Sequence, residues 1–159
     1  MLWRLIGLVG CFVSSGCLDS TPVKQRPISN EQLAVMFDLA VGQVCPLPEH
    51  KAICVGLQGI GERQMRDAPV SIIRQLAIAV RLPAYPNSRC GFDVFPFVTE
   101  GNAKAMLYTV KIEKMDRNGI ITFWATAIFG NLGAEGTQYQ LVRSRGKWLA
   151  RSTGGQVIS

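Results

Sequence analysis

The spacing of apolar residues changes near residue 90 of this 159-residue chain, and that change limits the folds open to it. Before it, apolar residues recur every three to four positions, as on one face of an α-helix. They predict one helix from about 30 to 43 and a second from about 67 to 81. From Cys90 on, apolar and polar residues alternate, as in strands with one buried face. The sequence therefore predicts an α+β domain in which helices come first and most strands last.

The second half of the chain predicts four antiparallel strands joined by short connections. A strand over about 106–112 leads to the turn Asp116-Arg117-Asn118-Gly119, where Asn-Gly suits a hairpin with positive φ at both central positions. The next strand, 120–129, is apolar on both faces, so we expect it to be central and covered. The remaining segments are a glycine-rich loop (130–136), strands at 137–142 and 147–150, and a turn over 143–146. The expected fold is two helices packed on a mainly antiparallel β-meander sheet.

Local signals complete this single domain, which we expect to span 29–159. Ser29, followed by Gln32 three residues later, has the form of a capping box at the first helix. Asp67 is predicted to cap the second helix, with Pro69 in its first turn. Three further segments are predicted: a strand at 52–57, a loop at 83–88, and a short edge strand carrying Phe92, Val94 and Phe97.

The first seventeen residues have the features of an export signal. A positive start, Met1 to Arg4, precedes an uncharged apolar run, Leu5 to Val13, that is too short to cross a bilayer. Ser14-Ser15-Gly16 then leads to Cys17. Residues 1–16 are therefore predicted to be a signal peptide.

This ending resembles the lipobox of bacterial lipoproteins, in which small residues precede a cysteine that becomes lipidated. Ser14 departs from the pattern, because leucine is usual at that position. The resemblance implies lipidation of Cys17 and attachment to a membrane through the lipid anchor. The polar residues that follow are interrupted by two prolines, so 17–28 is predicted to be the lipidated N-terminus and a tether. Leu18 is not aspartate, which by analogy with enterobacterial lipoproteins implies an outer-membrane lipoprotein facing the periplasm. A soluble periplasmic or secreted protein is the alternative.

The five cysteines are Cys11, Cys17, Cys45, Cys54 and Cys90. Signal cleavage removes the first and lipidation uses the second, so the last three make one disulfide and leave one thiol. We expect Cys45 to pair with Cys54, which closes a short loop, and pairing of Cys90 with either is the alternative. No zinc spacing is present, and the single histidine, His50, is predicted to be an ordinary surface residue. We therefore expect no metal site, no cofactor and no catalytic residue.

Positive charge gathers beside two predicted turns. The formal net charge is +6, and removing residues 1–16 takes away one base, Arg4, which leaves +5. Most bases are scattered, which argues against nucleic acid as a partner. The exceptions are Lys111, Lys114 and Arg117 near the first turn, and Arg143, Arg145, Lys147 and Arg151 near the last. If both turns emerge at the same edge of the sheet, these residues form a patch for lipid head groups, lipopolysaccharide phosphates or an acidic protein. The structural interpretation is a solvated edge that limits aggregation.

Other candidates for chemistry have simpler structural interpretations. The acidic pairs that acid–base chemistry could use are Asp93 with Glu100, Glu113 with Asp116, and Glu62 with Asp67. The segment Gly56 to Gly61 follows a predicted strand, but its spacing is not the dinucleotide-binding fingerprint, so we expect a turn. Trp124 and Trp148 lie in apolar strands and are expected in the core, and the lining of a ligand pocket is the alternative for either.

The last third of the chain carries a looser resemblance. Tyr139-x-Leu141, Arg145-Gly146-Lys147-Trp148 and Val157-Ile158-Ser159 are similar to the closing strands of cystatin-like and nuclear-transport-factor-2-like domains, and of uncharacterised secreted bacterial proteins. The resemblance covers about 105–159 and implies a cone-shaped α+β fold. Members of that superfamily include enzymes and binding proteins, so the fold does not decide the function. A strand at 52–57 is not typical of it.

These observations predict a non-enzymatic bacterial envelope lipoprotein that binds a partner protein or an envelope component. One alternative is a small-ligand-binding or enzymatic domain of the nuclear-transport-factor-2-like type. It would hold a pocket between sheet and helices with inward polar groups such as Tyr108 or Thr126. A second alternative is a toxin-immunity or inhibitor lipoprotein.

Overall fold

The computed structural model describes residues 27–131 and 133–158, so the predicted signal peptide, Cys17 and nearly all of the predicted tether lie outside it. The helices are α1 (Asn30–Gln43), α2 (Val70–Val80) and the short 3-10 helix η1 (Asn87–Arg89). The strands are β1 (Ala52–Gln58), β2 (Arg66–Asp67), β3 (Ala84–Pro86), β4 (Cys90–Phe92), β5 (Pro96–Val98), β6 (Ala103–Met115), β7 (Ile121–Gly130), β8 (Gly133–Ser144) and β9 (Lys147–Ile158). The predicted α+β class is confirmed. Among these residues, no helix is both long and apolar enough to cross a membrane.

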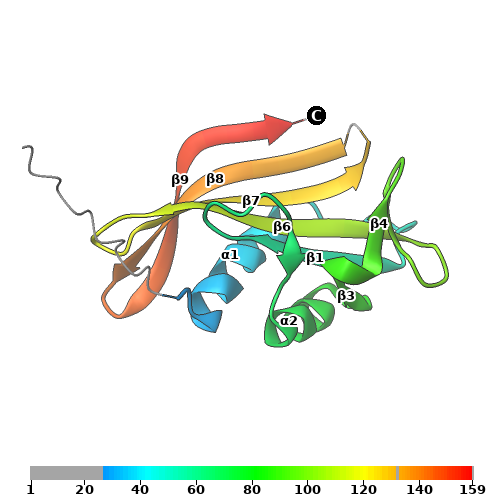
Figure 1. Ribbon diagram of the computed structural model, residues 1–159, viewed down its shortest axis with the longest axis horizontal. Coiled ribbons are helices and arrows are strands. Elements are labelled where there is room, and N and C mark those ends of the chain that lie inside the picture. The colour runs from blue at the N-terminus through cyan, green and yellow to red at the C-terminus, as the bar shows by residue number, and fades with distance from the viewer. Residues whose placement is uncertain (1–26, 132, 159) are drawn as a thin grey trace, which may run out of the picture.

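The principal sheet has the strand order β2-β1-β6-β7-β8-β9 (Figure 1). The strands β6 to β9 pair with their chain neighbours in antiparallel fashion, whereas β1 runs parallel to β6 and to β3. Because β1 and β6 are parallel, Gln58 near the end of β1 lies opposite Lys111 in the second half of β6. The strand predicted between the two helices is therefore present, and it pairs with β6.

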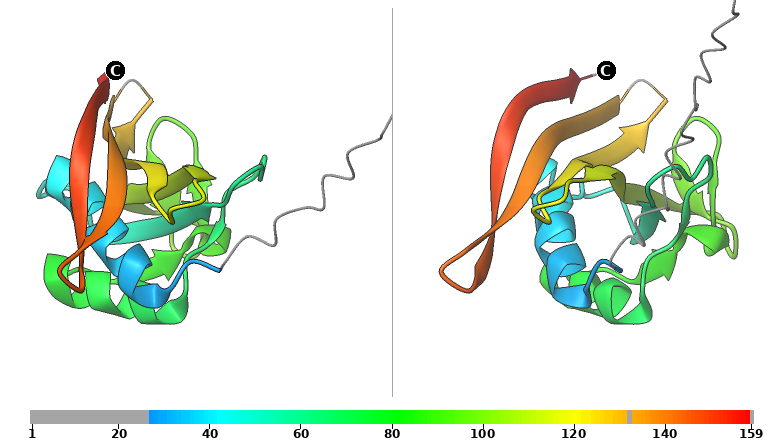
Figure 2. Two further views of the ribbon diagram at one scale, coloured as in Figure 1. Left: turned by 90° about the vertical axis from the view of Figure 1, so that its left-hand side faces the viewer. Right: turned by 60° about the vertical axis from the view of Figure 1, so that its left-hand side comes forward.

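Both α-helices lie on one face of this sheet, which we call the helix face; the opposite one is the outer face (Figures 1 and 2). The helix α1 packs across β6 to β9, and α2 packs against α1 and β3. Met36 and Phe37 of α1 meet Tyr108 of β6 and Phe123 of β7, and all four side chains are 0% exposed. The apolar helix pattern of the sequence and the alternating strand pattern thus form a common core.

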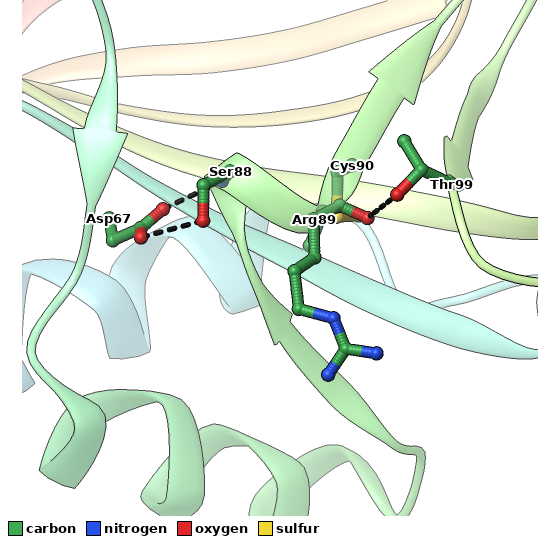
Figure 3. The surroundings of a disulfide bond; sticks show 6 residues. Asp67, Ser88, Arg89, Cys90 and Thr99 are labelled. Carbon is green, nitrogen blue, oxygen red and sulfur yellow. Dashed lines mark hydrogen bonds between the residues drawn. A yellow bond between two sulfur atoms is a disulfide. The ribbon is translucent and has the colours of Figure 1, made fainter.

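The two helices begin in different ways. At α1 the predicted capping box is present: the Gln32 N–H donates to the Ser29 hydroxyl at 3.2 Å, and the Ser29 N–H donates to Gln32 Oε1 at 2.8 Å. At α2 the predicted cap is wrong, because Asp67 belongs to β2 and Pro69 occupies the N-cap position without a side-chain cap. The Asp67 carboxylate instead accepts the backbone N–H and the hydroxyl of Ser88 (Figure 3). Its partner is distant in sequence, so local spacing could not reveal it.

The connections contain more strand than the sequence predicts. The expected loop at 83–88 includes β3 and the start of η1, and the expected single edge strand is the small hairpin of β4 and β5. Of the expected loop over 130–136, Gly130 belongs to β7 and residues 133–136 belong to β8, and Gly130 pairs with Gly133. These short strands form because they pair with neighbouring strands, and the local sequence of each segment does not predict that pairing.

The two turns at the ends of β6 and β8 differ in backbone geometry. In the β6–β7 turn only Gly119 has a positive φ, 79°, so the predicted Asn-Gly geometry is wrong at Asn118. Asp116 closes this turn by accepting the N–H groups of Asn118 and Ile120 at 2.9 and 2.8 Å. In the β8–β9 turn both Arg145 and Gly146 have positive φ, 50° and 81°, as a two-residue hairpin requires.

The disulfide joins Cys54 to Cys90, 36 residues apart, and Cys45 is free and exposed. The favoured pairing of Cys45 with Cys54 is therefore wrong, and the alternative through Cys90 is the one formed. The bond ties β1 to β4 (Figure 3). On the outer face beside it, a small cluster of Ala52, Cys54, Val98 and Ala105 is buried. Next to it, the Arg89 carbonyl accepts both the N–H and the hydroxyl of Thr99. The disulfide thus fastens the β4–β5 segment over the first half of β6.

Candidate functional site

The two turns that carry the predicted cations emerge at the same end of the sheet (Figure 1). Because β6 to β9 pair antiparallel in chain order, the β6–β7 and β8–β9 turns share one end and the β7–β8 turn lies at the other. In the cross-strand register, Lys114 stands in one row with Thr122, Gln140 and Arg151. The condition for a basic patch is therefore met. We call this surface the basic end: Lys111, Lys114, Arg117, Arg143, Arg145, Lys147 and Arg151.

All seven side chains of the basic end are exposed. The ion pairs among the described residues are Arg66–Glu62, Arg89–Glu100 and Lys104–Glu49, and none of them includes a residue of the basic end. The acids among these cations are Glu113 and Asp116, whose carboxylates accept hydrogen bonds from uncharged donors. The basic end therefore keeps an excess of positive charge that suits an anionic partner.

One further cation was missed by sequence reasoning. Arg63 is exposed in the loop that follows β1, and β1 ends beside the second half of β6 because the two strands are parallel. The loop therefore lies toward the same end of the sheet as the basic turns. Only the parallel pairing places it there, and nothing in the local sequence predicts that pairing.

A groove of about 570 Å³ separates the start of α1 from the basic turns. The residues lining it include Pro27, Gln32, Met115, Asn118, Arg143 and Trp148. The Arg143 guanidinium lies 5.8 Å from the centroid of the Trp148 ring, and Trp148 packs against the core while remaining partly exposed. Pro27 is the first described residue, so the segment leading from Cys17 joins the domain at the basic end.

The sequence predicts Trp124 in the core, but this prediction is wrong, because Trp124 lies on the outer face of β7. It is partly exposed, and its register partners are Lys111 on β6 and Gln138 on β8. Its indole N–H donates to Glu113 Oε1 at 2.9 Å, and the Gln138 amide donates to Glu113 Oε2 at 2.8 Å. The strand β7 is central, as predicted, but its outer face is only partly covered.

The predicted acidic pairs have separate structural partners. Glu62 accepts the Gly59 N–H at 2.6 Å and pairs with Arg66, so a carboxylate already occupies the loop that could suggest phosphate binding. Glu100 pairs with Arg89, and its predicted partner Asp93 has no ion pair among the described residues. Glu113 and Asp116 accept hydrogen bonds from different donors. Within residues 27–131 and 133–158, no three His, Cys, Asp or Glu side chains gather closely enough to hold a metal ion.

A cavity of about 390 Å³ lies between the start of α1 and the ends of β1 and β6, where Leu33, Leu57 and Ile112 are among its lining residues. Neither Tyr108 nor Thr126, the inward polar groups of the small-ligand alternative, lines it. Tyr108 points inward as predicted, but it is 0% exposed and its hydroxyl donates to the Val44 carbonyl at 2.7 Å. Burial raises the pKa of this phenol, which keeps it protonated as a donor. The prediction for Thr126 is wrong, since it lies on the outer face against Gly136.

His50 is buried, at 3% exposed, whereas the sequence predicts a surface residue. Its Nδ1 accepts the Leu47 N–H at 3.0 Å, and its Nε2 has no hydrogen-bond partner among the described residues. Burial lowers the pKa of this imidazole, because the charged form is poorly solvated there. His50 and the free thiol of Cys45 line the same cavity of about 500 Å³, although no hydrogen bond joins them. Because Nδ1 accepts the Leu47 N–H, His50 stabilises the loop that precedes β1.

Because the pKa of folded His50 lies below that of the unfolded chain, acidification should favour unfolding. The unfolded state takes up a proton near pH 6.5 while the folded state resists it, so stability is full above that pH and falls below it. We expect a loss of at most about 1.4 kcal/mol per pH unit between pH 6.5 and 5.5. Urea unfolding at pH 7.5 and 5.5 measures it, and His50→Gln should lose this dependence. An equal acid dependence in both proteins would contradict the assignment.

No family model, curated protein or solved structure matches this chain.

Proposed function

We propose that this protein is a non-enzymatic bacterial envelope lipoprotein, anchored through Cys17, whose domain binds an anionic envelope component or partner protein through the basic end. The export signal and the lipobox resemblance support the compartment and the anchor. The Cys54–Cys90 disulfide is compatible with an oxidising space outside the cytoplasm. The outer membrane is the location that Leu18 favours.

The observation that carries this proposal is that the polypeptide joins the domain at the same end as the basic turns. Pro27 and Arg143 line one groove, and Asn118 of the other turn lines it too. The stretch from Cys17 to Pro27 spans at most about 35 Å when fully extended. A lipid anchor at Cys17 would therefore hold the basic end close to the membrane surface.

Electrostatics makes this orientation favourable. Each lysine or arginine near an anionic membrane surface contributes roughly 1 kcal/mol, and the attraction decays over about 8 to 10 Å in physiological salt. The cations of the basic end are exposed and unpaired among the described residues, so their charge is free to act at that range. The small-ligand alternative has less support, since Tyr108 is committed to Val44 and Thr126 faces outward.

The experiment that tests the anchor is an intact mass measurement on the full chain expressed in a Gram-negative host. We expect the mass of residues 17–159 plus three acyl chains, and one alkylatable thiol, Cys45. The Cys17→Ser variant should carry no lipid and should leave the membrane fraction after cleavage. A lipid-free mass for the unaltered chain, recovered in the soluble fraction, would contradict the proposal.

A further inference from the structure

The outer face carries a second surface, which is bordered by three cations of the basic end, Lys111, Lys114 and Arg151. One side chain from each of four neighbouring strands forms it, and we call it the Trp124 platform: Glu113 (β6), Trp124 (β7), Gln138 (β8) and Thr153 (β9). Glu113 accepts from the Trp124 indole at 2.9 Å and from the Gln138 amide at 2.8 Å. The Thr153 hydroxyl donates to the main-chain carbonyl of Gln138 at 3.2 Å. These bonds fix the orientation of the indole, of Glu113 and of the amide.

Gly155 allows the indole to reach across the sheet. A Cβ at this position would stand 3.2 Å from Trp124 Cη2 and 3.2 Å from the Gln138 Cβ, closer than ordinary packing permits. The ring therefore extends from β7 toward the backbone of β9 and remains partly exposed. A fixed aromatic surface surrounded by amide and hydroxyl groups is thus presented on the face that lacks helices.

Cations border this platform. Lys111 is the register partner of Trp124, and the row two residues along β7, at Thr122, holds Lys114 at one end and Arg151 at the other. All three are exposed and carry no ion pair among the described residues. The nearby negative charge of Glu113 is engaged by two N–H donors. The three cations outnumber the one carboxylate of the platform, Glu113, so the surroundings of the indole carry an excess of positive charge that suits an anion.

We propose that the Trp124 platform binds an anionic polysaccharide of the envelope. The apolar face of a sugar ring would stack on the indole, and the amides of Gln138 and Gln140 would meet ring hydroxyls. Lys111, Lys114 and Arg151 would pair with carboxylate or phosphate groups on the polymer. An acidic peptide or a lipid head group would need only the cations and would leave the fixed indole unused. This inference rests on the proposed function for its compartment, and it names the class of envelope component.

The test is a titration of the processed protein in neutral detergent. The probes are oligogalacturonate, which carries carboxylates, phosphorylated dextran, neutral dextran and polyglutamate. In a Trp148→Phe background, Trp124 fluorescence reports the site, and calorimetry measures affinity. We expect binding to at least one acidic polysaccharide. Whether the bound probe carries carboxylates or phosphates identifies the charged group of the natural polymer. Trp124→Ala should weaken that binding about tenfold or more.

Matched variants separate stacking from charge. Lys111→Glu and Arg151→Glu should each weaken binding several-fold, whereas Arg74→Glu, an exposed cation of α2 on the helix side, should leave it unchanged. Trp124→Phe keeps an aromatic face and should retain part of the affinity. Urea unfolding of each variant confirms that the domain remains folded.

Four results would overturn the inference. The first two are no binding of either acidic polysaccharide and equal binding of neutral dextran. The other two are equal binding of polyglutamate that Trp124→Ala does not weaken, and binding of anionic vesicles that Trp124→Ala abolishes. The last would make this face a membrane surface. A lipidated mass at Cys17 combined with any of these results would leave the anchor intact. A lipid-free mass combined with tight Trp124-dependent binding would instead refute the anchor alone.

Discussion

Phe123→Ala is expected to lower the free energy of unfolding by about 3 to 5 kcal/mol. The Phe123 ring is 0% exposed at the centre of the core and stacks on Tyr139, with 5.7 Å between ring centroids. Truncation removes this buried apolar surface and leaves a cavity between α1 and the sheet, which packed neighbours fill only in part. Equilibrium unfolding in urea, followed by far-ultraviolet circular dichroism, measures the loss.

The matched control is Phe92→Ala. Phe92 lies in the small β4–β5 hairpin and is 50% exposed, so its truncation removes little buried surface. We expect a change of about 1 kcal/mol or less. Similar losses for Phe92 and Phe123 would show that the core is not centred on β7.

Cys54→Ser is expected to cost about 4 kcal/mol. The Cys54–Cys90 bond closes a loop of 36 residues, and in the chain-entropy treatment a loop of this size stabilises the folded state by about that amount. Cys54 is also 0% exposed, so the new hydroxyl would be buried in an apolar cluster. Since a domain is stable by only about 5 to 15 kcal/mol, we expect a large fall in the urea midpoint.

The control for the disulfide is Cys45→Ser, which removes the exposed free thiol. It should change stability by no more than about 0.5 kcal/mol. Cys90→Ser should destabilise the protein as Cys54→Ser does, and peptide mapping without reductant should recover one Cys54–Cys90 crosslink. A Cys45–Cys54 crosslink, with Cys90→Ser neutral, would contradict the structure.

Features that depend on neighbouring residues could be predicted from the sequence. The capping box at Ser29 begins α1, and Pro46 lies shortly after its end. The alternation of Met106, Tyr108, Val110 and Ile112 identified β6 and its buried face, all four being nearly or fully buried. These signals sufficed for the α+β class.

Features that depend on residues distant in the sequence could not be predicted from it. Asp67 has the residue type of a helix cap, yet Ser88 holds its carboxylate. Cys54 lies nearer in sequence to Cys45 than to Cys90, and only the position of β4 over the outer face decides the pairing. His50 sits beside prolines and a glutamate, a composition typical of surface loops, although the fold buries its ring.

The candidate site divides in the same way. The cations of the basic end could be identified as residues, but their common location follows from strand order and turn direction. Trp124 could not be assigned to a face, because the β7 sequence is apolar on both. Its exposure becomes visible only once Phe123 is seen to occupy the helix face.

Hydrogen exchange on the lipidated protein tests the central claim, that the basic end faces an anionic surface, most directly. The protein is reconstituted into vesicles of zwitterionic lipid or of the same lipid with anionic lipid added. We predict slower exchange at residues 114–119 and 143–148 in the anionic vesicles alone. Arg117→Glu combined with Lys147→Glu should abolish this protection, and Lys51→Glu combined with Arg74→Glu, two exposed cations away from that end, should preserve it. Equal exchange at both turns in the two kinds of vesicle would contradict the account.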